Sequence, residues 1–88
     1  MEETKLDINQ TVKELTIMLL YLTSWTENAP YSYQRSWKGY DFGILDELAD
    51  EGFISDSKRS KSIVINEDGV TRAKELLSKY GIDFPLSN

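Results

Sequence analysis

Two residue types are absent from this sequence of 88 residues, which contains no cysteine and no histidine. Without cysteine there is no disulfide and no thiolate nucleophile, and without histidine the side chain that titrates nearest neutral pH is missing. The nitrogen and sulfur ligands of zinc sites are missing as well. The chain also has no phosphate-cradling glycine motif, calcium-loop spacing or nucleophile elbow. We therefore expect no catalytic residue, no metal and no cofactor, and predict that the protein is not an enzyme.

Long apolar runs and a basic N-terminal segment are also lacking. The longest apolar run covers residues 17–22, far short of the roughly 20 residues that a membrane-spanning helix needs. The sequence starts with an acidic segment, whereas a signal peptide starts with basic residues that an apolar stretch follows. Because the absence of cysteine suits a reducing compartment, we predict a cytoplasmic protein without a membrane span.

Positive charge is scarce, since 10 lysines and arginines stand against 15 aspartates and glutamates and give a net charge of −5. A phosphate backbone repels such a chain at long range unless its basic residues gather on one face. The hydrophobic content of 40% and the charged content of 28% are ordinary for a globular protein. We expect residues 1–88 to form one domain.

A first helix is predicted at about residues 8–24. Asp7 and Gln10 have the spacing of a capping box, which places the start of the helix there. Apolar residues then recur at steps of four and three, as on a helix with one face against a core: Ile8, Val12, Leu15, Leu19 and Leu22. We expect this face to point into the core of the domain.

A second apolar set lies off that face and consists of Ile17, Met18 and Leu20. The helix therefore carries apolar side chains around more of its circumference than one core contact requires. Two explanations stay open. Either the helix is central and is contacted from both sides within the fold, or the second set is the seam of a homodimer.

Residues 26–40 break the helical periodicity and are predicted to form a long connection. A loop of this length without structure of its own is typical of a functional segment. Aromatic residues concentrate in and around it, and they favour either core coverage or a binding surface. We expect Trp25 and Trp37 in the core, and Tyr31 and Tyr33 on a surface that binds a partner.

The remaining elements follow in a clear order. Asp41 can cap a second helix, and Gly52 ends it. Two short strands at residues 53–56 and 62–65 flank a polar, basic turn, as in a hairpin. A last helix ends at Gly81. This order predicts an α+β fold with three main helices and a two-stranded hairpin between the second and the third.

Part of the chain resembles a known family. The residues Leu-Ala-Asp-Glu-Gly-Phe-Ile at 48–54, the basic turn after them, and Ser-Ile-Val-Ile-Asn-Glu-Asp-Gly at 62–69 are similar to the wing region of MarR-type winged-helix regulators. With Trp-Lys-Gly-Tyr-Asp at 37–41, the chain resembles a family of small prokaryotic winged-helix-like domains of unknown function. The resemblance implies a winged-helix-like fold whose hairpin is the wing and whose second helix occupies the recognition position.

The second helix is strongly acidic and has no basic residue. Its acidic side chains are Asp41, Asp46, Glu47, Asp50 and Glu51. The phosphates of DNA would repel these five carboxylates, so we do not expect this helix to bind in a major groove and contact bases. We assign Asp46, Glu47, Asp50 and Glu51 to a face for a basic protein partner. The alternative is that they are solvated surface carboxylates.

Basic residues that could contact phosphates lie outside this helix. They are Arg35, Lys38, Lys58, Arg59 and Lys61. The last three lie in the turn between the two strands. Such a turn either touches phosphates or is a solubilising tip that keeps an edge strand from pairing elsewhere.

The sequence leads to two hypotheses on function. The first, which we prefer, is a winged-helix-like protein-interaction module that self-associates through its first helix and binds a partner through the tyrosines and the acidic helix. The second is a small DNA-binding transcriptional regulator that contacts DNA through the basic turn.

Overall fold

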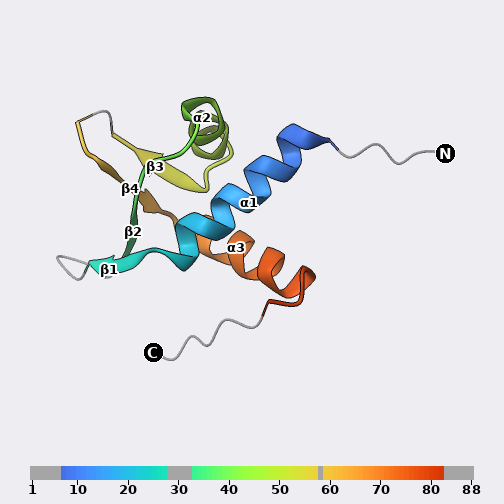
Figure 1. Cartoon of the computed structure of the whole chain (residues 1–88). Helices are drawn as coiled ribbons and strands as arrows, with labels where there is room; N and C mark the ends of the chain where they lie inside the picture. Colours follow the sequence, from blue (N-terminus) through green and yellow to red (C-terminus); the bar gives the residue numbers. More distant parts are fainter. Residues whose placement is uncertain (1–6, 28–32, 58, 83–88) are drawn as a thin grey trace.

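The computed structural model describes residues 7–27, 33–57 and 59–82. Three helices and four strands make up this part of the chain, and Figure 1 shows the helices to one side of the sheet. In chain order the elements are α1 (Ile8–Leu22), β1 (Trp25–Glu27), β2 (Tyr33–Trp37), α2 (Phe42–Asp50), β3 (Ile54–Asp56), β4 (Ser62–Ile65) and α3 (Glu67–Lys79). The predicted α+β class with three helices is confirmed.

Local sequence explains where α1 begins. The side chain of Asp7 accepts a hydrogen bond from the backbone N–H of Gln10 at 3.2 Å, as the capping spacing predicts. At the other end, the N–H of Thr23 donates to the carbonyl of Leu19 at 3.0 Å. The helix therefore has the predicted position.

The prediction of a loop over residues 26–40 is wrong, because this stretch includes most of β1 and all of β2. β2 pairs antiparallel with both β1 and β4 in a sheet of order β1-β2-β4-β3. The predicted hairpin of β3 and β4 is thus half of a four-stranded sheet rather than a separate two-stranded wing. This topology does not establish a winged-helix arrangement. The residues of β2, Tyr-Gln-Arg-Ser-Trp, include no β-branched one, so the usual strand signal is weak.

The two faces of the sheet differ. Ile54 lies opposite Ile65, Ser36 lies opposite Ile63, and all four are buried against the helices. The opposite face carries Trp37, which is 63% exposed, so its predicted place in the core is wrong. The ring of Trp37 lies 4.9 Å from that of the half-buried Trp25. Cross-strand aromatic packing explains this pair without a core position.

The core lies between the sheet and the three helices. Its largest fully buried apolar side chains come from α1, α2, β4 and α3 and are Ile17, Leu20, Leu45, Leu48, Ile63 and Leu76. In Figure 1, α1 crosses the molecule between α2 and α3, and it contacts both. No helix within the described residues is long and apolar enough to cross a membrane.

The turn after α2 positions the start of α3. Gly52 has a φ of 83°, and the next residue, Phe53, donates from its N–H to the carbonyl of Leu48 at 3.0 Å, which closes the helix as a Schellman motif. The carbonyl of Phe53 accepts a hydrogen bond from the N–H of Asn66 at 2.9 Å. A Cβ added to Gly69 would lie 2.1 Å from that carbonyl oxygen. Only glycine fits here, so the first turn of α3 packs directly on backbone.

Candidate functional site

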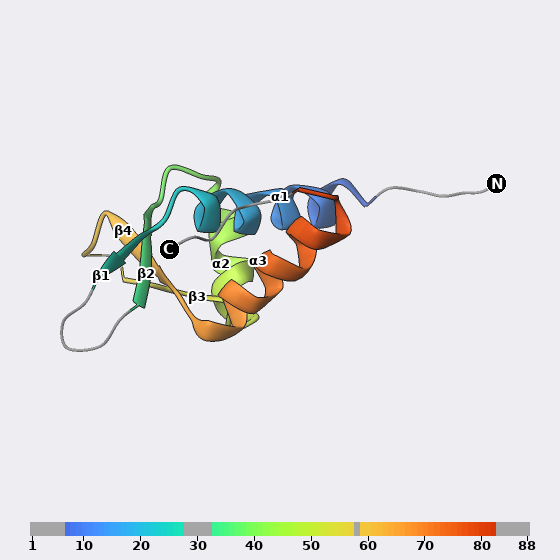
Figure 2. The same cartoon turned by 90° about the horizontal axis from the view of Figure 1, so that it is seen from below.

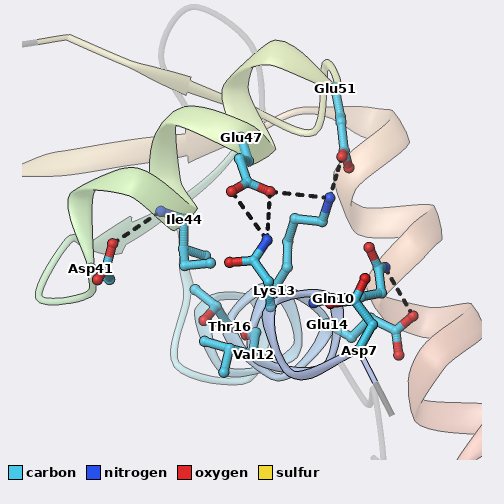
Figure 3. A network of polar contacts seen from close by, with 11 residues as sticks. Asp7, Gln10, Val12, Lys13, Glu14, Thr16, Asp41, Ile44, Glu47 and Glu51 are labelled. Carbon is cyan, nitrogen blue, oxygen red and sulfur yellow. Dashed lines mark hydrogen bonds and ion pairs between the residues drawn. The ribbon is translucent and has the colours of Figure 1, made fainter. Parts of the chain in front are cut away.

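The inner face of α1 is fastened to α2 by a buried lysine. The ammonium of Lys13 donates a hydrogen bond to Glu51 and lies 3.5 Å from a carboxylate oxygen of Glu47 (Figure 3). The hydrogen bond to Glu51 raises the pKa of Lys13 above its ordinary value, although burial acts in the opposite direction. The charge of Lys13 is therefore matched inside the chain.

One further contact holds α2 against the N-terminal half of α1, and a side-chain cap fixes where α2 begins. The amide of Asn9 donates to both carboxylate oxygens of Glu47, at 3.1 and 3.2 Å. Asp41 caps α2 by accepting from the N–H groups of Gly43 and Ile44 at 2.8 and 3.2 Å. Glu47 and Glu51, which the sequence assigns to a partner face, thus contact α1, and their side chains remain 41% exposed. Their assignment to a partner face stays a prediction.

On its other side, α1 is fastened to α3 through Glu14. Its carboxylate accepts hydrogen bonds from Gln10 at 3.1 Å, from the hydroxyl of Tyr80 at 3.1 Å and from Arg72 at 3.4 Å. The bond from Gln10 has the largest effect and lowers the pKa of Glu14, which partial burial alone would raise. The two charged residues of α1 thus both point to neighbouring helices.

The proposed homodimer seam is wrong. Ile17, Met18 and Leu20 are all buried, with exposed fractions of 4% or less, in the core between α2, α3 and the sheet. The buried polar residue beside them, Thr16, donates its hydroxyl to the carbonyl of Val12 at 2.7 Å. This face of α1 is a complete internal interface and leaves nothing for a second molecule to cover.

The predicted core face of α1 is the exposed one. Its exposed members, which we call the α1 stripe, are Ile8 at 67%, Val12 at 39%, Leu15 at 50% and Leu19 at 46%. Leu22, at the end of the row, is half-buried and packs against the core. In Figure 2, α1 runs along one side of the molecule, with α2 and α3 on its other side. The α1 stripe is thus an exposed apolar surface, although its helical spacing alone predicts a core face.

A groove of about 390 Å³ adjoins the N-terminal end of the α1 stripe. Ile8 and Val12 form its α1 side, and Ile44 with Gly43 and Glu47 forms its α2 side. At this end the stripe therefore continues into a depression between α1 and α2. A side chain of a docked molecule could enter this depression.

The basic residues predicted to contact phosphate do not form one free cluster. Arg35 donates to the hydroxyls of Ser62 and Ser60 at 2.9 and 3.1 Å. Lys38 forms an ion pair with Asp56 at 2.7 Å and also donates to the carbonyl of Ser57 at 2.9 Å. Arg35 and Lys38 thus hold the β3–β4 turn against β2.

In the turn itself, Arg59 and Lys61 are exposed, whereas Lys58 lies outside the described residues. The backbone N–H of Lys38 donates to the carbonyl of Lys61 at 3.3 Å, which places Lys61 beside the end of β2. The turn therefore presents two exposed basic side chains, those of Arg59 and Lys61.

The residues assigned to a partner face lie on different elements. Tyr33 is half-buried in β2, with Arg35 at 5.9 Å from its ring centre, and Tyr31 lies outside the described residues. Asp46 and Asp50 are exposed on α2. The structure thus does not join the tyrosine and the carboxylates into one surface. Among the described residues, no group of three acidic side chains is placed to hold a metal ion.

Comparison with known proteins gives a family without an assigned activity. Residues 8–83 match the family described as "Domain of unknown function (DUF6429)". "Uncharacterized protein y4hR" of Sinorhizobium fredii is 32% identical over 69 residues, which cover 77% of this chain and 85% of that protein. No solved structure matches, and neither match supports the resemblance to MarR-type regulators. The chain belongs to the DUF6429 family of domains of unknown function.

Proposed function

We propose that this protein is a non-enzymatic protein-interaction module that docks through the α1 stripe. One observation carries the proposal: four aliphatic side chains in a single row are 39% to 67% exposed on a helix whose opposite face is fully packed. Single exposed apolar residues are normal on a protein surface, but a continuous apolar surface marks an interaction site.

Polar residues do little to hydrate this surface. Lys13 and Glu14 are the charged residues of α1, and both are turned away from the stripe toward α2 and α3. The stripe residues are about half exposed, so covering them would contribute about 1 kcal/mol for each side chain. This free energy is available to binding and not to folding, because the exposed part of each side chain is in water in both the unfolded chain and the isolated domain.

The other parts of the proposal rest on composition. The chain lacks cysteine and histidine, which supports a role in binding rather than catalysis and a location in the cytoplasm. The exposed carboxylates of Asp46 and Asp50 are not needed for docking at the stripe, and we keep them as solvated surface charges.

Site-specific photocrosslinking in cells tests the proposal. We expect a photoreactive residue at Leu15 or Leu19 to form covalent adducts with protein, whether with a second copy or with another chain. The same residue at Lys74, which is exposed on α3, is the control and should give no adduct. Substituting Leu19→Glu in the Leu15-labelled chain should reduce the adduct at least tenfold. Adducts that are absent from the stripe, or equally strong at Lys74, would contradict the docking surface.

A second candidate function, DNA binding through the β3–β4 turn, is favoured by the exposure of Arg59 and Lys61 in that turn. It keeps the winged-helix interpretation, in which a basic wing contacts phosphates. A titration with random duplex DNA at low salt tests it. Binding should weaken steeply with added salt, and the double change Arg59→Ala and Lys61→Ala should flatten that dependence. Absence of binding at low salt would rule this candidate out.

A further inference from the structure

The spacing of the α1 stripe is that of a helix that packs against another helix. Ile8, Val12, Leu15, Leu19 and Leu22 follow at steps of four, three, four and three, the heptad pattern of a coiled-coil seam. The four exposed members fall within an arc of roughly 60° on a helix of 3.6 residues per turn. A face that packs on a mixed core is wider than this. The narrow row therefore fits one apolar helix better than a broad surface.

The residues of α1 at the edges of this row carry no charge. The residues that flank the seam positions in the heptad are Asn9, Thr11, Thr16, Met18 and Thr23, of which Thr16 and Met18 are buried. The acidic Asp41 and Glu47 of α2 lie beside the N-terminal end of the row, and an antiparallel partner brings its neutral C-terminal end to them. In helix pairs, charged residues at these flanking positions select the partner by attraction and repulsion. Because these flanking residues are neutral, no like charges of α1 lie against one another when the α1 helices of two copies pack together. An identical helix is thus accepted here even though the whole chain carries a net charge of −5.

We infer that the occupant of the α1 stripe is the α1 stripe of a second copy, packed antiparallel about a two-fold axis that passes near Leu15. This inference rests on the function proposed above, and it names the partner of the same surface. Leu15 is the middle of the heptad row that begins with Ile8 and ends with the half-buried Leu22, and it lies seven residues from both. A two-fold contact presents the same patch on both molecules, so the aliphatic side chains of one copy meet those of the other.

The position of α2 selects the antiparallel orientation. α2 lies beside the N-terminal half of α1, through the contacts of Asn9 and Lys13 with Glu47, and it carries no basic residue. A parallel pair would place the two acidic α2 helices at the same end of the dimer. With the axis near Leu15, an antiparallel pair sets the two Asn9 positions about 18 Å apart along the helix axis and the two Lys13 positions about 6 Å apart. The first separation exceeds the Debye length of about 8 Å at physiological ionic strength, and at the second the carboxylate of Glu51 is paired with Lys13, so repulsion between the two α2 helices is weak.

Single-cysteine variants test the orientation cleanly, because the natural chain has no cysteine. Under mild oxidation, Leu15→Cys should form a disulfide-linked dimer. Ile8→Cys should not, because an antiparallel pair holds the two residues 8 about 21 Å apart along the helix axis. A mixture of Ile8→Cys and Leu22→Cys chains should link to each other. Efficient linkage of Ile8→Cys to itself would overturn the antiparallel arrangement.

Sedimentation equilibrium tests the association itself. We expect the average mass to rise with concentration from the monomer value of 10.1 kDa toward twice that value. Leu15→Glu should raise the dissociation constant at least a hundredfold. Thr11→Glu should raise it about tenfold, because it adds a charge to the neutral edge. An acidic residue in the first turn favours the helix, so a loss of folding does not explain the second result. Lys74→Glu is the matched control and should change nothing.

The failure of this inference and the failure of the proposed function are distinguishable. A mass of 10.1 kDa at every concentration up to the millimolar range would show that a second copy is not the occupant. Photocrosslinks from Leu15 to a different protein would then still support docking at the stripe. The absence of both dimer and stripe-specific crosslinks would reject both conclusions.

Discussion

The two faces of α1 are both apolar, but they are used in different ways. The buried face combines Ile17 and Leu20 with two polar residues, Lys13 and Thr16, whose hydrogen bonds are made within the domain. The exposed face is a plain row of aliphatic side chains. The comparison teaches that the most regular apolar row of a helix is not always its core face. A buried face can include charge when neighbouring helices supply the partners.

The largest expected effect comes from shortening neighbouring leucines on the two faces. Leu20→Ala should lower the free energy of unfolding by about 3 kcal/mol, because Leu20 is fully buried and the change leaves a cavity. Leu19→Ala should lower it by less than about 1 kcal/mol in dilute solution, because Leu19 is half exposed. Urea unfolding at low micromolar protein concentration measures both values. Equal losses would show that the two faces do not differ as described.

The contribution of the buried charge on the inner face can be measured with Lys13→Met. This change removes the hydrogen bond to Glu51 and the ion pair with Glu47, and should lower stability by about 1.5 kcal/mol. Because the pKa of Lys13 is raised in the folded chain, its contribution is complete below its ordinary pKa and is lost as the pH rises through the higher folded value. We would measure the free energy of unfolding of the natural chain and of Lys13→Met by urea between pH 7 and pH 11. The difference between the two free energies should become smaller at the alkaline end. Lys74→Met, on exposed α3, should show no such trend.

A smaller effect is expected where the inner face contacts α3. Glu14→Gln should lower stability at neutral pH by about 0.5 to 1 kcal/mol, because the bonds from Arg72 and Tyr80 lose a charged acceptor. The pKa of Glu14 is lowered in the folded chain, so its contribution is present above its ordinary pKa and is lost as the pH falls through the folded value. Thermal unfolding of the natural chain and of Glu14→Gln between pH 7 and pH 3 tests this pH dependence. If the stability difference between the two chains grew as the pH fell, the assigned role of Glu14 would be contradicted.

Helix positions were predictable because their signals are local. Asp7 and Asp41 cap α1 and α2 as expected, and Gly52 ends the second helix with a positive φ. The orientation of α1 was not predictable, because its two apolar sets both repeat at helical spacing and periodicity does not say which set faces inward. The deciding contacts, from Lys13 to α2 and from Glu14 to α3, join residues that are far apart in the sequence.

The sheet was predictable only in part, for a related reason. β3 and β4 contain apolar and β-branched residues next to a polar turn, so their hairpin was visible. β2 is held mainly by pairing with two neighbours, and one of them, β4, lies 25 or more residues further along the chain. Arg35 and Trp37 point away from the core, so β2 shows no apolar face that would mark it as a strand.

The close approach at Gly69 has a consequence for the whole DUF6429 family. The first turn of α3 touches the Phe53 carbonyl so tightly that even a methyl group would push the two apart. Relatives that preserve this junction must retain glycine at the equivalent alignment column, whatever happens to the residues around it. A homologue with a larger residue there would have to tilt its third helix, and with it the anchoring of Glu14 that leaves the aliphatic row open to a partner.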